Sequence, residues 1–88
     1  MKVAQKPSFK RVYKKLHNNQ RQAVNLAIRS IIENPKLDEE KKGDLAGIFV
    51  HKFDCVNQQY LLAYQWRVES RTLLMLGVHE NYYKKLKQ

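Results

Sequence analysis

The sequence predicts an α+β fold with an N-terminal strand, a helical hairpin, a three-stranded antiparallel meander and a short C-terminal helix. Three observations predict it. Between residues 9 and 32, apolar residues recur every three to four positions, as on helix faces. From residue 48, they form β-branched and aromatic runs separated by short polar turns. The length of 88 residues suits one domain spanning residues 1–88.

Residues 2–6 are expected to form a short strand. Pro7 and Ser8 then mark the start of a helix, with Ser8 as its expected N-cap. The apolar face of this helix comprises Phe9, Val12, Tyr13 and Leu16. The opposite, cationic face comprises Lys10, Arg11, Lys14 and Lys15. The first helix is therefore predicted to be amphipathic, with a basic outer side.

A short break at residues 17–19 separates this helix from a second one, which Asn18 or Asn19 can cap. The apolar stripe of the second helix comprises Val24, Ala27, Ile28 and Ile31, widened by Leu26 and Ile32. Asn34 ends the helix, because the residue before a proline avoids helical geometry. So short a link predicts that the two helices form an antiparallel hairpin.

Residues 36–44 are charged and are expected to be irregular. The predicted strands of the meander are residues 48–53, 57–67 and 72–78, joined by turns at 54–57 and 68–71. These runs are apolar on both faces, so both sides of the sheet need cover. We expect the helical hairpin on one side and a helix at residues 80–87 on the other.

The net charge of +9 arises from 17 Lys and Arg against 8 Asp and Glu. The imbalance is greatest at the N-terminus, where the first 32 residues hold eight basic residues and no acid. Such a surface attracts nucleic acid, anionic lipid or an acidic protein.

Other features exclude several classes of function. Cys55 is the only cysteine, so it forms neither an intrachain disulfide nor a zinc site built on cysteine pairs. A reducing, cytoplasmic compartment and an inert Cys55 in a turn are expected. The three histidines are too far apart for a metal motif, and His51 is expected to be structural. Without a glycine-rich phosphate loop or a long apolar run, we predict no cofactor, no metal and no membrane contact.

Four segments carry a resemblance to a known family. They are residues 9–16, with aromatics and lysines before a leucine; 43–47, which read Gly-Asp-Leu-Ala-Gly; 59–64, ending in tyrosine; and 74–83, where a histidine precedes two tyrosines. In this order they resemble the RelE/ParE superfamily, the toxins of bacterial type II toxin–antitoxin pairs. The resemblance covers nearly the whole chain. Two departures concern the site: Leu61 and Glu80 stand where many members have arginine.

Resemblance to the RNA-cleaving branch implies ribosome-dependent cleavage of messenger RNA without a metal. This chemistry needs an acid and a base, together with cations that stabilise the charge on the phosphate. The expected catalytic residues are His79 as acid or base, Tyr82, and Lys52 and Arg67 at the phosphate, although Tyr83 could replace Tyr82. The expected RNA- or phosphate-binding residues are Arg71 in the turn before the last strand, Lys10, Arg11, Lys14, Lys15 and Lys84.

The ParE-like branch implies a different function, inhibition of DNA gyrase by protein binding without catalysis. Leu61 and Glu80 favour that alternative, and a third possibility is an inactive, nucleic-acid-binding toxin. In either toxin reading the partner is a cognate acidic antitoxin, partly disordered, which wraps the N-terminal helices or the sheet groove. The resemblance implies that this complex binds operator DNA mainly through the antitoxin, and that the ribosome or gyrase is the target.

Overall fold

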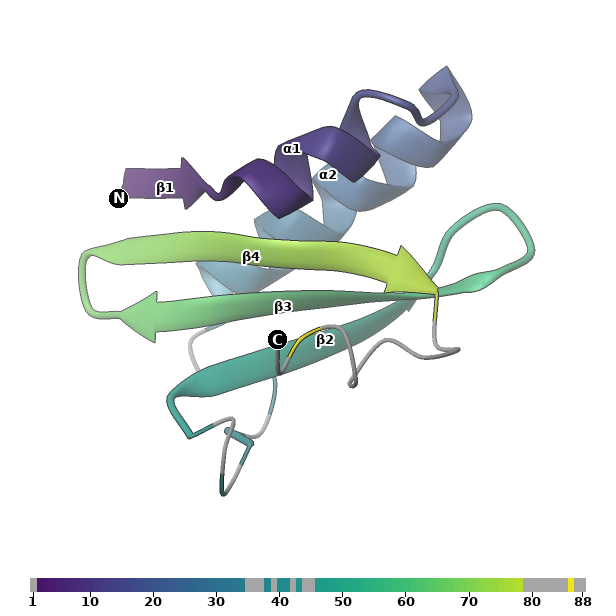
Figure 1. Ribbon diagram of the computed structural model, residues 1–88. Coiled ribbons are helices and arrows are strands. Elements are labelled where there is room, and N and C mark those ends of the chain that lie inside the picture. The colour runs from purple at the N-terminus through teal and green to yellow at the C-terminus, as the bar shows by residue number, and fades with distance from the viewer. Residues whose placement is uncertain are drawn as a thin grey trace.

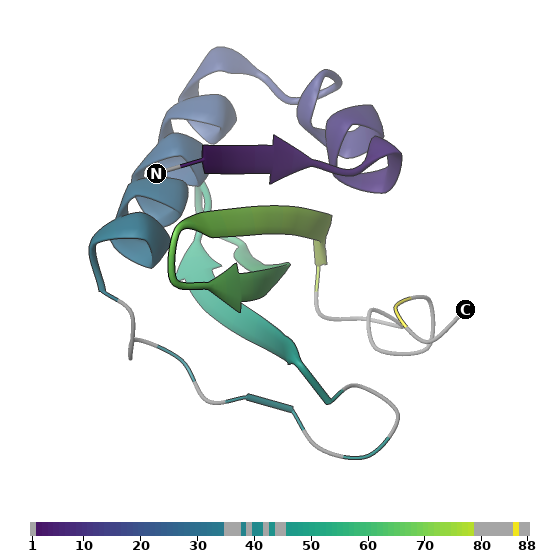
Figure 2. The same cartoon turned by 90° about the vertical axis from the view of Figure 1, so that its left-hand side faces the viewer.

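One mixed four-stranded sheet, covered on one face by two helices, organises the chain (Figures 1 and 2). The computed structural model describes residues 2–34, 38, 40–41, 43, 46–78 and 86. The elements are β1 (Lys2–Gln5), α1 (Pro7–Tyr13), α2 (Asn18–Glu33), β2 (Ile48–Asp54), β3 (Gln59–Arg67) and β4 (Ser70–Val78). The predicted α+β class is confirmed. None of the described helices is both long and apolar enough to cross a membrane.

The strand order is β1-β4-β3-β2. Strands β2, β3 and β4 form the predicted antiparallel meander, while β1 runs parallel to β4 and places Val3 opposite Arg71. Figure 1 shows the chain running along α1 and returning along α2, as expected for a helical hairpin. The N-terminal strand therefore completes the sheet only by pairing with the last strand.

A β-bulge interrupts β4 at Leu74. Tyr64 lies opposite Leu73, and Ala63 lies opposite Met75, so Leu74 has no partner in β3. A bulge bends the strand and shifts the alternation of its side chains. As a result, Leu74 and Met75 both pack on the sheet face that lies away from the helices.

The predicted N-cap of α1 is wrong. Pro7 occupies the first turn and Lys6 is the cap residue, an arrangement that suits proline because its missing N–H would have no helical partner there. Ser8 instead donates its hydroxyl to the carbonyl oxygen of Leu74, at 2.7 Å, and so ties α1 to the bulge. The helix ends at Tyr13, and Leu16 is buried beyond it.

The start of α2 also differs from the prediction, because the cap residue is His17 rather than Asn18 or Asn19. The side-chain oxygen of Gln20 accepts a hydrogen bond from the His17 backbone N–H at 2.9 Å. Arg21 joins the two helices by donating to the carbonyl oxygen of Lys14 at 2.7 Å, which satisfies a carbonyl left open where α1 ends. The predicted end at Asn34 is confirmed.

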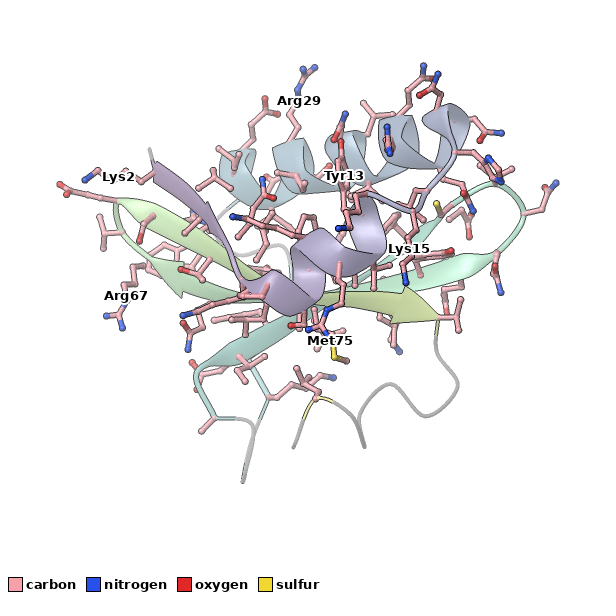
Figure 3. All side chains as sticks on the ribbon, turned by 45° about the horizontal axis from the view of Figure 1, so that its top comes forward. Lys2, Tyr13, Lys15, Arg29, Arg67 and Met75 are labelled. Atoms are coloured by element: carbon pink, nitrogen blue, oxygen red, sulfur yellow. The ribbon has the colours of Figure 1, made fainter. Side chains whose placement is uncertain are left out.

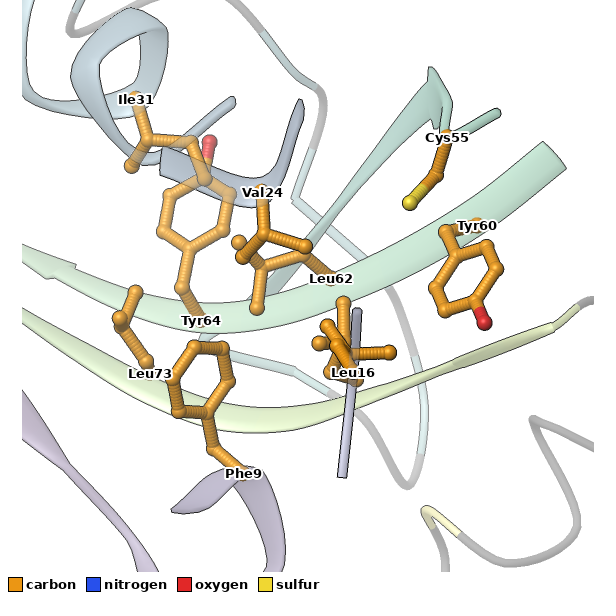
Figure 4. Packing of buried hydrophobic residues seen from close by; sticks show 10 residues of the cluster. Phe9, Leu16, Val24, Ile31, Cys55, Tyr60, Leu62, Tyr64 and Leu73 are labelled. Carbon is orange, nitrogen blue, oxygen red and sulfur yellow. The ribbon is translucent and has the colours of Figure 1, made fainter. Parts of the chain in front are cut away.

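The main core lies between the helices and the sheet (Figure 4). Phe9 from α1 and Val24 and Ile31 from α2 pack with Leu62 and Leu73 of the two central strands. Leu26, expected to widen the apolar stripe of α2, is 63% exposed and faces solvent, so that expectation is wrong. A second cluster of Val50, Leu61 and Ala63 lies on the other face of the sheet.

Two strand boundaries need correction. β3 begins at Gln59 rather than at residue 57, because Val56 and Asn57 adopt positive φ in the preceding turn. β4 begins at Ser70, so the hairpin turn contains only Val68 and Glu69, and Arg71 lies in a strand. The predicted helix at residues 80–87 lies outside the described residues except for Leu86, which packs on the second cluster.

Arg71 is buried in the core, with 2% of its surface exposed. Its guanidinium donates to the carbonyl oxygen of Ile31 near the end of α2, at 3.3 Å, and to that of Arg67 at 2.6 Å. The same group lies 4.8 Å from the centre of the Trp66 ring, within cation–π range. One side chain thus joins the end of α2 to the β3–β4 hairpin, and its charge suits the negative end of the helix dipole.

We expect Arg71→Ala to lower the free energy of unfolding by about 2–4 kcal/mol, because buried carbonyl groups lose a charged donor. Arg71→Lys should recover little of it, since an ammonium lacks the planar fork that reaches carbonyls on two elements. Urea denaturation measures both changes. Arg29→Ala, at an exposed site on α2, is the control and should change stability by less than about 0.5 kcal/mol. An Arg71→Ala protein as stable as the control would contradict this role.

Candidate functional site

The sheet face opposite the helices, called the outer face below, has an apolar floor of Val50, Leu61 and Ala63. Ile48, Leu74, Met75 and Leu86 pack against this floor. Figure 3 shows Met75 projecting from the sheet on the side below α1. Val50, Leu61 and Ala63 are themselves buried, so a ligand on the outer face has access to the side chains around this floor and not to the floor itself.

A groove of about 560 Å³ lies between the start of α1 and the outer face. The residues that line this α1 groove are Lys6, Pro7, Ser8, Arg11, Ile48, Gln65, Leu74, Met75 and Leu86. The Ser8–Leu74 hydrogen bond fixes the wall formed by α1. Among these lining residues are two exposed cations, Lys6 and Arg11, and no carboxylate. The groove therefore favours an anionic ligand with an apolar part.

Lys52 lies on the same face, at the other end. It is exposed on β2, opposite Leu61, which in turn lies opposite Gly77 of β4. Across two strand spacings, Lys52 and Gly77 are about 10 Å apart. Asp54 follows on the same side of β2 and is also exposed. Lys52 thus stands beside the end of β4, which the structure describes as far as Val78.

The structure does not bring Lys52 and Arg67 together. Both point to the outer face, but Arg67 is six residues further along β3 than Leu61, the partner of Lys52. At the rise of a β-strand this separates them by roughly 20 Å. Arg67 is exposed at the end of the β3–β4 hairpin, where its side chain extends outward (Figure 3). One phosphate cannot contact both residues.

A cluster of ionisable groups lies on the helix side of the sheet. Nδ1 of His51 is 3.2 Å from both carboxylate oxygens of Asp38, and the Tyr64 hydroxyl donates to Asp38 at 2.8 Å. The side chains of His51 and Asp38 are only 13% and 14% exposed. The cluster holds Asp38, which lies between α2 and β2 in the sequence, against the sheet. The sheet separates it from the outer face, which agrees with a structural role for His51.

Burial raises the pKa of Tyr64 above its ordinary value, and its hydrogen bond to Asp38 adds to the rise because it favours the protonated hydroxyl. Burial likewise raises the pKa of Cys55 and of Tyr60. Cys55 lies in the β2–β3 turn, and its thiol donates to the Gln20 carbonyl oxygen at 3.6 Å. A buried, protonated thiol is a poor nucleophile.

No three or more described His, Cys, Asp and Glu side chains gather closely enough to hold a metal ion. The ionisable groups described above also lie on opposite faces of the sheet. Among the residues that the structure describes, the exposed ionisable groups of the outer face are therefore its cations and Asp54.

The fold resembles three solved structures, each 17% identical in sequence. A YoeB/ParE toxin from Agrobacterium tumefaciens aligns over 90% of this chain and 99% of its own, with a TM-score of 0.69. The intact E. coli RelBE toxin–antitoxin complex aligns over 90% of this chain and 96% of the matched chain, with a TM-score of 0.70. The isolated E. coli RelE toxin aligns over 98% and 95%, with a TM-score of 0.68. At this identity the likeness shows the fold.

A search of curated proteins gives no match. The family model described as "ParE-like toxin of type II bacterial toxin-antitoxin system" matches residues 3–87. The chain belongs to this family. It is the toxin of a type II toxin–antitoxin system, and the predicted RelE/ParE resemblance is confirmed.

The toxin presents most of its predicted site cations at the surface. Lys10, Arg11, Lys14 and Lys15 are exposed on and just after α1, and Lys52 and Arg67 are exposed on the sheet. Arg71 differs: it was expected in a turn at the phosphate, but it lies in β4 with its guanidinium buried against backbone carbonyls. The structure therefore corrects the placement of Arg71 and removes it from the candidate site. His79, Tyr82, Tyr83 and Lys84 lie outside the described residues.

Sequence reasoning missed two residues of the α1 groove, Lys6 and Gln65. Lys6 was assigned to the end of a strand, although its position just before Pro7 places it at the start of α1. Gln65 is a polar residue within an apolar strand, on the same face as Ala63 and Arg67. This polar interruption of an apolar run was the feature of the sequence that could have marked Gln65 as a candidate site residue.

The toxin should lose stability at alkaline pH, and Tyr64→Phe should lessen that loss. Unfolded tyrosine ionises near 10.0, whereas folded Tyr64 stays protonated to higher pH. Its contribution is therefore complete below pH 10 and is lost as the pH rises through the folded pKa. Urea unfolding between pH 7 and pH 11 measures this dependence. The control, Tyr13→Phe, removes a hydroxyl that donates to Asn25. An equal alkaline loss in wild type and Tyr64→Phe would rule out this contribution.

Proposed function

We propose that the toxin is a metal-independent endoribonuclease that cleaves messenger RNA on the ribosome and so blocks translation. One observation carries the proposal. Exposed cations stand at both ends of the outer face, Lys6 and Arg11 in the α1 groove and Lys52 beside the end of β4. An RNA strand that reaches from one end of this face to the other meets cations at both ends, and electrostatic contacts of this kind dominate the affinity for nucleic acid.

The chemistry would take place at the Lys52 end. A base removes the proton from the ribose 2′-OH, the 2′-oxygen attacks the adjacent phosphorus, and an acid protonates the leaving 5′-oxygen. An exposed ammonium such as Lys52 can stabilise the charge that builds on the phosphate oxygens. His79 follows Val78, the last residue of β4, and an imidazole suits proton transfer near neutral pH. We assign acid–base work to His79 and either Tyr82 or Tyr83.

Arg67 and the lysines of α1 would bind RNA without taking part in the reaction. Arg67 is too far from Lys52 to share its phosphate. Lys10, Lys14 and Lys15 lie outside the α1 groove and are suited to contacts with ribosomal RNA. Lys84, which lies outside the described residues, keeps its expected role in phosphate binding.

Inhibition of DNA gyrase is the second candidate function. Ala63 lies at the middle of the outer face, with Val50 opposite it, and both are buried, so they offer no group that could stabilise a charged phosphate. A face whose cations lie at its two ends also suits a protein partner. This candidate needs no catalytic residue, and it predicts toxicity that does not depend on His79.

Expression in bacteria, with growth measurement and primer-extension mapping of transcripts, tests the proposal. Wild type should arrest growth and produce discrete cuts, and His79→Ala should abolish both. Lys52→Ala should reduce cutting about 10²-fold, the typical loss of one group that stabilises a transition-state charge. Lys2→Ala, a matched change of an exposed lysine on β1, should cut like wild type.

Two outcomes contradict the endoribonuclease. Growth arrest with intact transcripts, unchanged in His79→Ala, would favour gyrase inhibition. Affinity for RNA without toxicity would indicate an inactive, nucleic-acid-binding toxin.

We further propose that the cognate antitoxin covers the basic helices with an acidic segment that folds on binding. Its affinity should fall at least tenfold between 50 mM and 500 mM salt, because exposed charges are screened over shorter distances as salt increases. Replacing Lys10, Lys14 and Lys15 with Gln should weaken binding at low salt and flatten the salt dependence, as titration calorimetry can measure. Affinity that is independent of salt in both proteins would exclude the electrostatic contribution.

A further inference from the structure

Gln65 is the polar residue of β3 that faces the α1 groove. It is half-buried, and its neighbours in the groove include Ile48, Leu74 and Met75. The backbone of Gln65 pairs with Ile48 on one side and Thr72 on the other. Its side-chain amide carries two N–H donors and a carbonyl acceptor, and within the described part of the chain none of these makes a hydrogen bond. The amide is therefore available to a ligand in the groove.

Two further features define the chemistry of that ligand. Lys6 and Arg11 line the same groove, so a phosphate can be neutralised beside the amide. Leu74 and Met75, which the bulge places on the same side, offer an apolar surface against which a flat ring can pack. Neither Lys6 nor Arg11 forms an ion pair with a carboxylate in the part of the chain that the structure describes.

We propose that the α1 groove binds one nucleotide of a single-stranded RNA, with Gln65 hydrogen-bonding the edge of the base and Lys6 and Arg11 contacting its phosphate. This inference rests on the proposed function and adds a site of base recognition to it, distant from the Lys52 end. The amide places a donor and an acceptor side by side, which matches the amino group and N7 of adenine. With the base held by this edge the groove selects adenine, because guanine presents two acceptors there and each pyrimidine presents a single polar group.

Binding of 2′-O-methyl pentanucleotides that differ only in the central base tests the inference. They lack the free 2′-OH and so cannot be cleaved by attack of that group. By fluorescence anisotropy, the full-length wild-type toxin should bind the adenine oligonucleotide roughly 5- to 150-fold more tightly than the others, as expected for a bidentate contact. Gln65→Met should reduce that affinity to the level of the other three bases and leave those three unchanged.

Gln59→Met is the matched control, because Gln59 is an exposed glutamine on the same face of β3, outside the groove. It should keep the adenine preference. Arg11→Ala should weaken all four oligonucleotides by a similar factor and reduce the slope of log affinity against log salt by about one. The methyl resonance of Met75, one of two methionines in the chain, reports directly on occupancy of the groove.

Three results would overturn the inference. They are an adenine preference that survives in Gln65→Met, a Met75 resonance that no oligonucleotide shifts, and a shift of that resonance by a glutamate-rich peptide alone, which would assign the groove to a protein partner. These results leave the proposed function standing if transcript cuts still depend on His79. Intact transcripts in cells that express the wild-type toxin, together with adenine-selective binding in vitro, would instead refute the nuclease and retain the groove.

Discussion

The arrangement of this toxin depends on the buried guanidinium of Arg71, which holds the end of α2 in place on the sheet. It joins the end of α2 to the β3–β4 hairpin and also packs on Trp66. Apolar packing has little directional preference, so this hydrogen-bonded anchor fixes the position of the end of α2 on the sheet. Because β1 pairs with β4 from Lys2 to Gln5, the same region also sets where α1 begins. The geometry of the α1 groove thus depends on Arg71, a buried cation that does not line the groove.

Much of the fold was predictable because the spacing of hydrophobic residues along the sequence indicates whether a segment forms a helix or a strand. The stripes containing Phe9 and Val24 and the aromatic alternation of β3 each predicted an element of the correct type. The errors lie where tertiary contacts override local preference. Ser8 reads as a helix cap, but its hydroxyl has a partner on β4, 66 residues away. Arg71 reads as an exposed turn residue, because a sequence does not reveal that carbonyl groups will surround it.

The candidate site was less predictable than the fold, since it depends on which strand ends meet. Lys52 and Arg67 both follow apolar runs and both point to the outer face, yet register places them at opposite ends of it. Lys6 and Gln65 meet across 59 positions of sequence, and neither belongs to a recognisable motif. Leu61, which stands where the family resemblance implies an arginine, belongs to the buried apolar floor. The structure places cations instead at the two ends of an apolar floor.

The parallel pairing of β1 with β4 has a consequence for how the chain is made. Val3 reaches its partner Arg71 only after four-fifths of the polypeptide exists, and contacts between such distant positions form slowly. Until then the growing chain presents two basic helical segments whose apolar faces have no sheet to cover. During protein synthesis the toxin therefore passes through a stage in which it is not yet folded, carries a positive charge and exposes the apolar faces of its helices. An acidic partner already present in the cell could therefore bind the incomplete chain before the folded toxin exists.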